Sequence, residues 1–220
     1  MKVGIYYPGY KPESGGGYTF ENEVLTSLIQ LAGESSHQFI LLHDITPNRP
    51  HLSPIKEISI EKSKPKKVIR LVINKLLDLL NYQNKKKVYY SLSEACSNEH
   101  LEFVWFLTPI YGRVNLPYIA TIWDIQHRLQ PWFPEVGSLK EWQGREKYNS
   151  WFIQRAAFII VPNKTSQEEI TFFYRIPTDR FLLLPHPTPK ICLQTPQQVN
   201  EVLQKYGLLK NRFLLYPAQF

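Results

Sequence analysis

Short runs of consecutive apolar residues recur along the chain, and stretches with helical spacing separate them. Such a run is typical of a strand buried on both faces, because a half-exposed strand alternates apolar and polar residues. Strands and helices that alternate along a chain form a parallel sheet. We therefore expect an α/β, Rossmann-like fold, with a mostly parallel sheet and helices on both faces. The runs cover residues 2–7, 37–43, 102–108, 118–123, 158–161 and 181–184.

The first helix is expected over residues 18–33, where Gly33 is placed to end it. Its apolar residues share one face: Phe20, Val24, Leu28 and Leu31. Further helices are expected over 66–80, 88–97 and 139–157, and one more after a cap at Asn163 or Thr165. Residues 55–60 alternate with period two and add a strand. In parallel sheets ligands bind where strands end at their carboxyl side, so the residues that follow each strand are the candidates for a site.

A proline-rich stretch divides the chain near its end. Prolines at 185, 187 and 189 disfavour both helix and sheet, which is typical of a linker. After it, residues 197–206 look helical and 213–216 look like a strand. One helix and one strand cannot form a domain by themselves. We therefore expect a Rossmann-like domain over 1–188, followed over 189–220 by a linker and the start of a truncated C-terminal domain.

The net charge of +7 comes from one segment. Residues 56–87 hold nine lysines and one arginine against three acidic residues, so 10 − 3 = +7, while the rest holds 16 basic and 16 acidic residues. So local an excess disfavours a nucleic-acid-binding protein. The predicted helix over 66–80 has a wide apolar face, which suits a helix packed on the sheet. It also suits a helix lying on an anionic membrane surface through the lysines of 56–87.

No apolar run approaches the ~20 residues that cross a bilayer, and the N-terminus does not resemble a signal peptide. Cys96 and Cys192 match no metal-ligand spacing and are expected to be reduced thiols. We expect a cytoplasmic protein, peripheral on the inner face of the membrane if the basic segment binds lipid, with neither a metal nor a cofactor.

A run of three glycines, Gly15, Gly16 and Gly17, lies between the first strand and the first helix. Glycine lets backbone N–H groups approach a ligand, and a helix N-terminus favours an anion there. The run is neither a G-x-G-x-x-G fingerprint nor a phosphate-binding P-loop. It predicts either a substrate-binding loop or a flexible surface turn.

Polar and ionisable residues gather where the run at 118–123 emerges into a loop. Asp124 or His127 could exchange a proton with a substrate or bind a sugar hydroxyl, and Arg128 could bind a phosphate. Each also has an ordinary structural interpretation: Asp124 as a turn residue or helix cap, and His127 as a surface or capped loop histidine.

The order of these segments resembles the GT-B glycosyltransferases of family 4, also called group 1 glycosyltransferases. The resemblance follows the glycine loop, then LPYIATIWDIQHRLQPWFPE at 116–135, REKYNSWFIQRAAFIIVPNKTSQEEITFFYRIPTDRFLLLPHPTP at 145–189 and RFLLYPAQF at 212–220. It implies two Rossmann-like domains facing a cleft, the first holding the acceptor and the second the nucleotide-sugar. It also implies sugar transfer with retention and without a metal.

The resemblance also assigns residues. Gly15 to Gly17 match the family's loop near the donor phosphates and the acceptor, and Asn163 begins the segment that matches its polar strand–turn–helix. The family's usual His-Asp pair corresponds here to Trp123 and Asp124, which leaves His127 as the candidate histidine. Asp124 and His127 are therefore the candidate catalytic residues. The candidate substrate-binding residues are Gly15, Gly16, Gly17, Trp123, Arg128 and Asn163.

These observations predict the N-terminal domain of a glycosyltransferase of the hexosyltransferase type. It would transfer a sugar from a nucleotide-sugar to a glycan or lipid-linked glycan, and would be inactive alone because the donor residues follow the last predicted strand. Two alternatives remain open. One is another nucleotide-dependent Rossmann enzyme such as a dehydrogenase, although the G-x-G-x-x-G fingerprint is missing. The other is a non-catalytic binding module.

Overall fold

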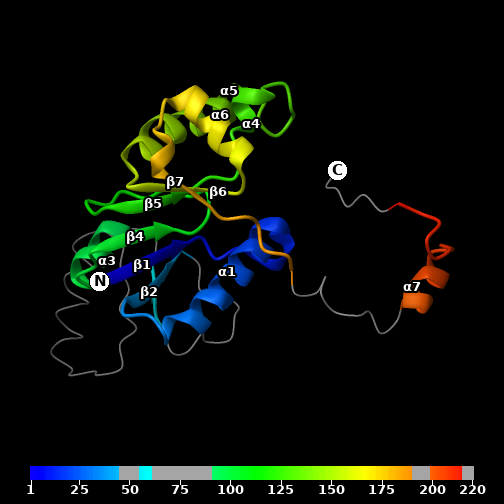
Figure 1. Cartoon of the computed structure of the whole chain (residues 1–220), viewed down its shortest axis with the longest axis horizontal. Coiled ribbons are helices and arrows are strands. Elements are labelled where there is room, and N and C mark those ends of the chain that lie inside the picture. The colour runs from blue at the N-terminus through cyan, green and yellow to red at the C-terminus, as the bar shows by residue number, and fades with distance from the viewer. Residues whose placement is uncertain (45–54, 61–90, 190–198, 215–220) are drawn as a thin grey trace, which may run out of the picture. The chain divides into compact units, whose positions relative to one another are not determined.

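In the part of the chain that the structure describes, seven parallel strands form one sheet. The structure is a computed structural model that describes residues 1–44, 55–60, 91–189 and 199–214. Within them the strand order is β3-β2-β1-β4-β5-β6-β7, and each neighbouring pair is parallel (Figure 1). The expected α/β, Rossmann-like fold is confirmed. The strands are β1 (Lys2–Tyr7), β2 (Gln38–His43), β3 (Lys56–Ser59), β4 (Phe103–Phe106), β5 (Tyr118–Thr121), β6 (Phe158–Val161) and β7 (Phe181–Leu183).

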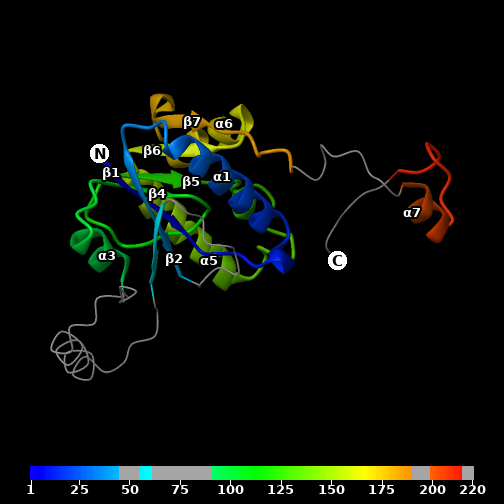
Figure 2. The ribbon, with the colours of Figure 1, turned by 90° about the horizontal axis from the view of Figure 1, so that it is seen from below.

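Helices pack on both faces of this sheet, because the strands present apolar residues on both sides. In β1, Ile5 and Tyr7 join the core under α1, whereas Tyr6 joins the larger core under α3 and α6. Helices α1 and α3 accordingly lie on different sides of the strands (Figure 2). The helices of this part are α1 (Gly16–Ala32), α3 (Leu92–Asn98), α4 (Gln126–Leu129), α5 (Leu139–Tyr148) and α6 (Lys164–Tyr174), with the short turns η1 (Pro12–Ser14), η2 (Asn149–Ile153) and η3 (Thr178–Arg180).

Side-chain caps begin three of these helices. The side chains of Ser91, Ser138 and Asn163 accept hydrogen bonds from backbone N–H groups of α3, α5 and α6. Each bond satisfies one N–H group that the first turn of a helix leaves without an intrahelical partner. Asn163 is thus the helix cap that the sequence offered, and it is exposed at the carboxyl edge of the sheet, just after β6.

Two expectations about helices need correction. Leu31, expected on the buried face of the first helix, is 60% exposed. The 17-residue α1 is roughly 25 Å long, and the strands it covers are only about 20 Å long, so its last turn extends past them. The helix expected over 139–157 is α5 followed by the π-helical turn η2. The helix expected over 66–80 lies outside the described residues.

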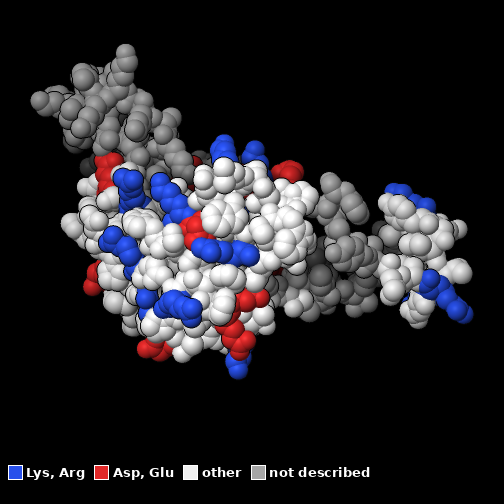
Figure 3. Space-filling model, turned by 90° about the horizontal axis from the view of Figure 1, so that it is seen from above, with Lys and Arg blue, Asp and Glu red and all other residues white. Residues whose placement is uncertain are grey.

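Charged side chains are mixed on the surface shown in Figure 3, where lysine and arginine alternate with aspartate and glutamate. Most of the basic segment 56–87 lies outside the described residues, so its attachment to a membrane stays a prediction. No helix within the described ranges is long and apolar enough to cross a bilayer. Cys96 is a free, buried thiol, and burial raises its pKa to about 12.

The chain divides into two compact units, Met1–Pro187 and Thr188–Phe220. The first unit contains the sheet and all the elements named so far. The second contains α7 (Val199–Lys205), and its described residues from 206 to 214 are exposed. The site described below belongs to the first unit alone.

Candidate functional site

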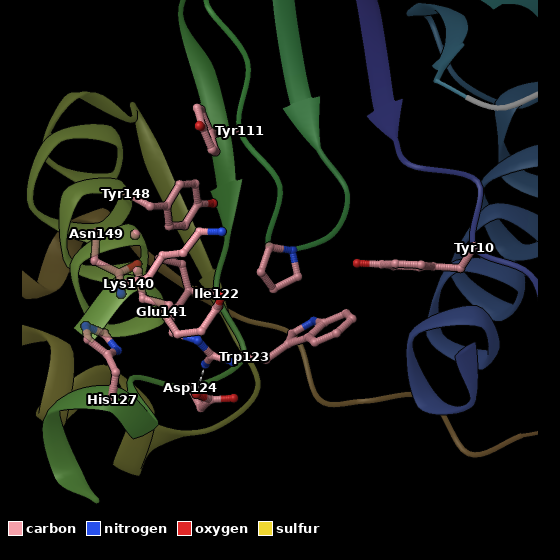
Figure 4. A pocket seen from close by; sticks show the side chains of 13 residues that line it. Tyr10, Tyr111, Ile122, Trp123, Asp124, His127, Lys140, Glu141, Tyr148 and Asn149 are labelled. Carbon is pink, nitrogen blue, oxygen red and sulfur yellow. Dashed lines mark ion pairs between the residues drawn. The ribbon is translucent and has the colours of Figure 1, made fainter. Parts of the chain in front are cut away.

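A pocket of about 600 Å³ opens where β1, β4 and β5 end (Figure 4). The strand order reverses between β1 and β4, and ligands of open α/β sheets bind beside such a reversal. Its size is ordinary for a small-molecule site, which is about 300–1,000 Å³. The loops after the three strands, the short helix α4, helix α5 and the start of η2 supply its walls: Tyr10, Pro109, Tyr111, Ile122, Trp123, Asp124, His127, Lys140, Glu141, Gly144, Arg145, Tyr148 and Asn149.

Tyr10 brings the glycine loop to this pocket. The buried carboxylate of Glu21 in α1 accepts a hydrogen bond from the backbone N–H of Tyr10, 3.2 Å away, and fixes the loop after β1. Gly17 lies against the Tyr10 ring, since a Cβ at this position would be 3.2 Å from two ring carbons. Gly15 precedes α1 with a φ of 64°, a conformation that favours glycine. Only Gly15 lies before α1, and Gly16 and Gly17 begin the helix rather than forming a loop. Gly17 therefore supports Tyr10 in the wall, although the pocket is not lined by the glycines themselves.

Trp123 belongs to a cluster of three rings that contact one another. Its ring centroid lies 5.3 Å from that of Phe20 in α1 and 5.8 Å from that of His186, in edge-to-face arrangements. The indole Nε1 is buried and lacks a hydrogen-bond partner. Because these contacts fix the ring, Trp123 offers the pocket a rigid aromatic surface.

Asp124 stands at the rim, with its side chain 53% exposed. Its Oδ1 accepts a hydrogen bond from the backbone N–H of Gln126 at 2.9 Å, as in a turn, and lies 3.6 Å from a guanidinium nitrogen of Arg145. Burial, and then the negative charge of Asp124, raise the pKa of Glu169 in α6. Asp124 therefore combines the turn role with a place in the pocket wall.

His127 lines the pocket and is almost completely buried. Its Nε2 lies 3.2 Å from Oε2 of Glu146 in α5 and 3.2 Å from the hydroxyl oxygen of Tyr174 in α6. Its Nδ1 is buried without a hydrogen-bond partner. A buried polar atom of this kind costs about 1–3 kcal/mol, so it calls for an explanation. Burial lowers the pKa of His127, although the hydrogen bond to Glu146 partly opposes the shift.

Arg128 turns away from the pocket and pairs with Glu146. Its Nε donates to Oε2 at 2.8 Å, and a terminal nitrogen donates to Oε1. The guanidinium also lies over the rings of Trp142, Phe173 and Tyr174. These contacts occupy the guanidinium N–H groups that would otherwise donate to a phosphate.

The structure therefore brings together Trp123, Asp124 and His127, as the sequence predicts for residues that follow one strand. Gly17 lies behind the Tyr10 ring, which lines the pocket, and Arg128 and Asn163 lie outside the pocket lining. The roles assigned to all of these residues stay predictions.

Sequence reasoning missed the wall that α5 supplies. Residues 140, 141, 144, 145 and 148 line the pocket at the spacing of one helix face. That spacing of lysine, glutamate, arginine and tyrosine was visible in the sequence. Tyr10 and Tyr111, which follow β1 and β4, were also accessible to the rule that ligands bind after strands.

We expect the protein to lose stability in mild acid partly through His127. In the unfolded chain histidine titrates near pH 6.5, whereas burial lowers the pKa of His127 in the folded state. Below about pH 6.5 the unfolded chain therefore binds a proton that the folded protein does not, and the free energy of unfolding falls by at most about 1.4 kcal/mol per pH unit until the lowered pKa is reached. Urea unfolding at several pH values should show that the free energy of unfolding falls less steeply with decreasing pH in His127→Gln than in the wild-type protein.

The matched control is His37→Gln, because His37 is exposed. Glu146 affects the free energy of unfolding at lower pH than His127 does. Burial alone would raise its pKa, but hydrogen bonds from Arg128, Tyr174 and His127 lower it overall, so its stabilising effect is lost as the pH falls below about 4.5. Equal changes of slope for the two histidine variants would contradict the assignment to His127.

Comparisons with known proteins give a structural likeness to a glycosyltransferase. No family model and no curated protein match the sequence. The chain is similar to the crystal structure of a glycosyltransferase from Rickettsia africae ESF-5, with 12% sequence identity and a TM-score of 0.46. The match covers 96% of this chain and 50% of that one, so the chain spans about half the length of that protein.

Proposed function

We propose that this chain is the acceptor-side domain of a glycosyltransferase that moves a hexose from a nucleotide-sugar to a glycan or lipid-linked glycan. The observation that carries the proposal is the pocket at the strand-order reversal, which combines aromatic walls with hydrogen-bonding groups. The order of segments along the chain, which resembles family 4 of the GT-B glycosyltransferases, supports it independently.

The composition of the pocket suits a sugar. A sugar ring has C–H faces that pack on aromatic rings and hydroxyl groups that both donate and accept hydrogen bonds. Tyr10, Tyr111, Trp123 and Tyr148 supply rings, and Asp124, His127 and Asn149 supply polar atoms. A few polar groups in a largely apolar wall are what orient a small ligand.

The donor is proposed to bind mainly elsewhere. Lys140 and Arg145 are the cations that line this pocket, and Arg145 already faces Asp124. A nucleotide diphosphate needs several charged or backbone donors together. The resemblance assigns these donors to a second domain after the linker, so residues 1–220 should bind UDP- or GDP-sugars weakly.

A direct test is oligosaccharide binding to the 220-residue chain on an array of immobilised glycans. Trp123→Ala should weaken binding of the glycan about tenfold, because truncating an aromatic anchor that the ligand covers typically costs more than about 1 kcal/mol. Trp132→Ala is the matched control, since Trp132 is 70% exposed and lies outside the pocket lining. Equal losses in both variants, or no retained glycan, would refute a sugar site at this pocket.

Calorimetry with UDP- and GDP-sugars tests whether the donor binds outside this domain. Low-micromolar binding to the chain alone would mean that this domain carries a donor site. A non-catalytic binding module would retain glycans in the same way. The two hypotheses differ in catalysis. If the chain is a binding module, a protein that joins it to a downstream domain should hydrolyse no nucleotide-sugar.

A further inference from the structure

We infer that Glu146 fixes His127 in the tautomer with its proton on Nε2, so that Nδ1 accepts a hydrogen bond from a hydroxyl group of the ligand in the pocket. The ligand half of this inference rests on the proposed function, because it assumes a ligand rich in hydroxyl groups. The tautomer half rests on the hydrogen-bond network alone.

The surroundings of Nε2 favour a proton there. A carboxylate only accepts hydrogen bonds, so the ring nitrogen 3.2 Å from Oε2 of Glu146 is the one that donates. The hydroxyl of Tyr174 donates to the same Oε2 at 3.0 Å, which leaves its oxygen able to accept from Nε2. The carboxylate therefore selects this tautomer of a neutral ring, and the tyrosine hydroxyl, which can accept as well as donate, is compatible with it.

Glu146 is itself held in place. Arg128 binds both of its carboxylate oxygens, and the guanidinium lies over three aromatic rings. A carboxylate fixed by a bidentate arginine cannot easily rotate away from His127. Glu146 is thus a positioning residue, which acts on the ligand only through the imidazole.

The other edge of the ring is left with an unused acceptor. Nδ1 carries a lone pair in this tautomer, and it is buried without a partner in a side chain that lines the pocket (Figure 4). Ligand entry has to displace whatever covers Nδ1. Lys140 and Glu141 line the same pocket with exposed side chains, which can change rotamer when a ligand enters. A ligand hydroxyl would then satisfy the nitrogen that the fold leaves unsatisfied.

Nitrogen-15 NMR of the histidine rings in the labelled chain tests the tautomer without any ligand. Two-bond proton–nitrogen correlations identify which ring nitrogen is protonated. We expect His127 to be neutral at pH 7, with its proton on Nε2. A proton on Nδ1 in the wild-type protein would overturn the inference, and this measurement does not depend on the folding of any variant.

Variants then test the role of Glu146. E146A removes the acceptor, so the ring should populate both tautomers. E146Q keeps an amide oxygen that can accept from Nε2, so the original tautomer should persist. E168A is the matched control, because Glu168 is an exposed glutamate on α6 that lies outside the pocket lining. A single unchanged tautomer in folded E146A would show that Glu146 does not select it.

A titration with methyl α-D-mannopyranoside and methyl α-D-glucopyranoside tests the contact with the ligand. We expect the unprotonated Nδ1 resonance of His127 to move upfield as it accepts a hydrogen bond. If these sugars perturb Trp123 but leave Nδ1 unchanged, the contact is refuted while the sugar site stands. If no sugar binds here or on the glycan array, the proposed function fails together with the contact, and the tautomer result remains valid.

Discussion

Replacing Phe152 by alanine should lower the free energy of unfolding by about 3–5 kcal/mol, the usual loss for a large aromatic removed from a packed core. Phe152 has no exposed surface and belongs to the larger of the two cores. Its ring lies at 4.6, 4.8 and 5.1 Å from the rings of Tyr118, Phe106 and Tyr148. The cavity that alanine leaves would therefore be bounded by rigid rings, which cannot easily collapse into it.

Urea unfolding of the full chain measures this loss. Phe172→Ala is the matched control, because Phe172 is 63% exposed and substitutions of this kind usually change stability by less than about 0.5 kcal/mol. Similar losses for the two variants would mean that the core does not depend on the Phe152 cluster.

The same change should also reach the pocket. Phe152 lies in η2, four residues after Tyr148 and three after Asn149, both of which line the pocket wall. The Tyr148 ring stacks on Phe152, and the Tyr148 hydroxyl donates to the backbone oxygen of Ile110 at 3.4 Å. Because a core aromatic supports the wall from behind, Phe152→Ala should weaken ligand binding even in the fraction that remains folded.

The fold could be predicted from the sequence because buried parallel strands have a strong signature. Runs such as 37–43 and 158–161 contain apolar residues on both faces, and only a sheet covered on both sides can bury them. The exposure of the last turn of α1 was harder to predict. Leu31 fits the apolar spacing, but it is exposed because the helix extends past the strands that it covers. Helical spacing shows which residues share a face, but not how far the neighbouring layer extends.

The site was predicted in part for the same reason. Trp123, Asp124 and His127 follow one strand, so the rule that ligands bind after parallel strands places them together. Glu146 was not predictable in this way, because it lies on another helix, 19 residues from His127 and 18 residues from Arg128 in the sequence. The pairing also changes the interpretation of Arg128. An arginine beside a strand end suggests a phosphate site until its carboxylate partner is known.

Glu146→Ala should lower the free energy of unfolding by about 3 kcal/mol, a value at the low end for breaking a buried ion pair because Glu146 and Arg128 keep some exposure. The change leaves the Arg128 guanidinium, the Tyr174 hydroxyl and Nε2 of His127 without their common acceptor. Groups that lose one partner retain the full cost of their desolvation. Urea unfolding at neutral pH measures the loss, and E146Q should lose less because an amide oxygen can still accept.

A double-mutant cycle separates the pair from the rest of the network. Arg128→Met removes the charge but keeps an apolar chain that can pack on Trp142 and Phe173, so Arg128→Met with Glu146→Ala should lose clearly less than the sum of the two single changes. The difference should be at least about 1 kcal/mol, since residues in one ion-pair network typically couple by 0.5–3 kcal/mol. Additive losses would show that Arg128 does not hold Glu146 energetically. The carboxylate would then be free to leave His127, and the fixed imidazole would lose its support.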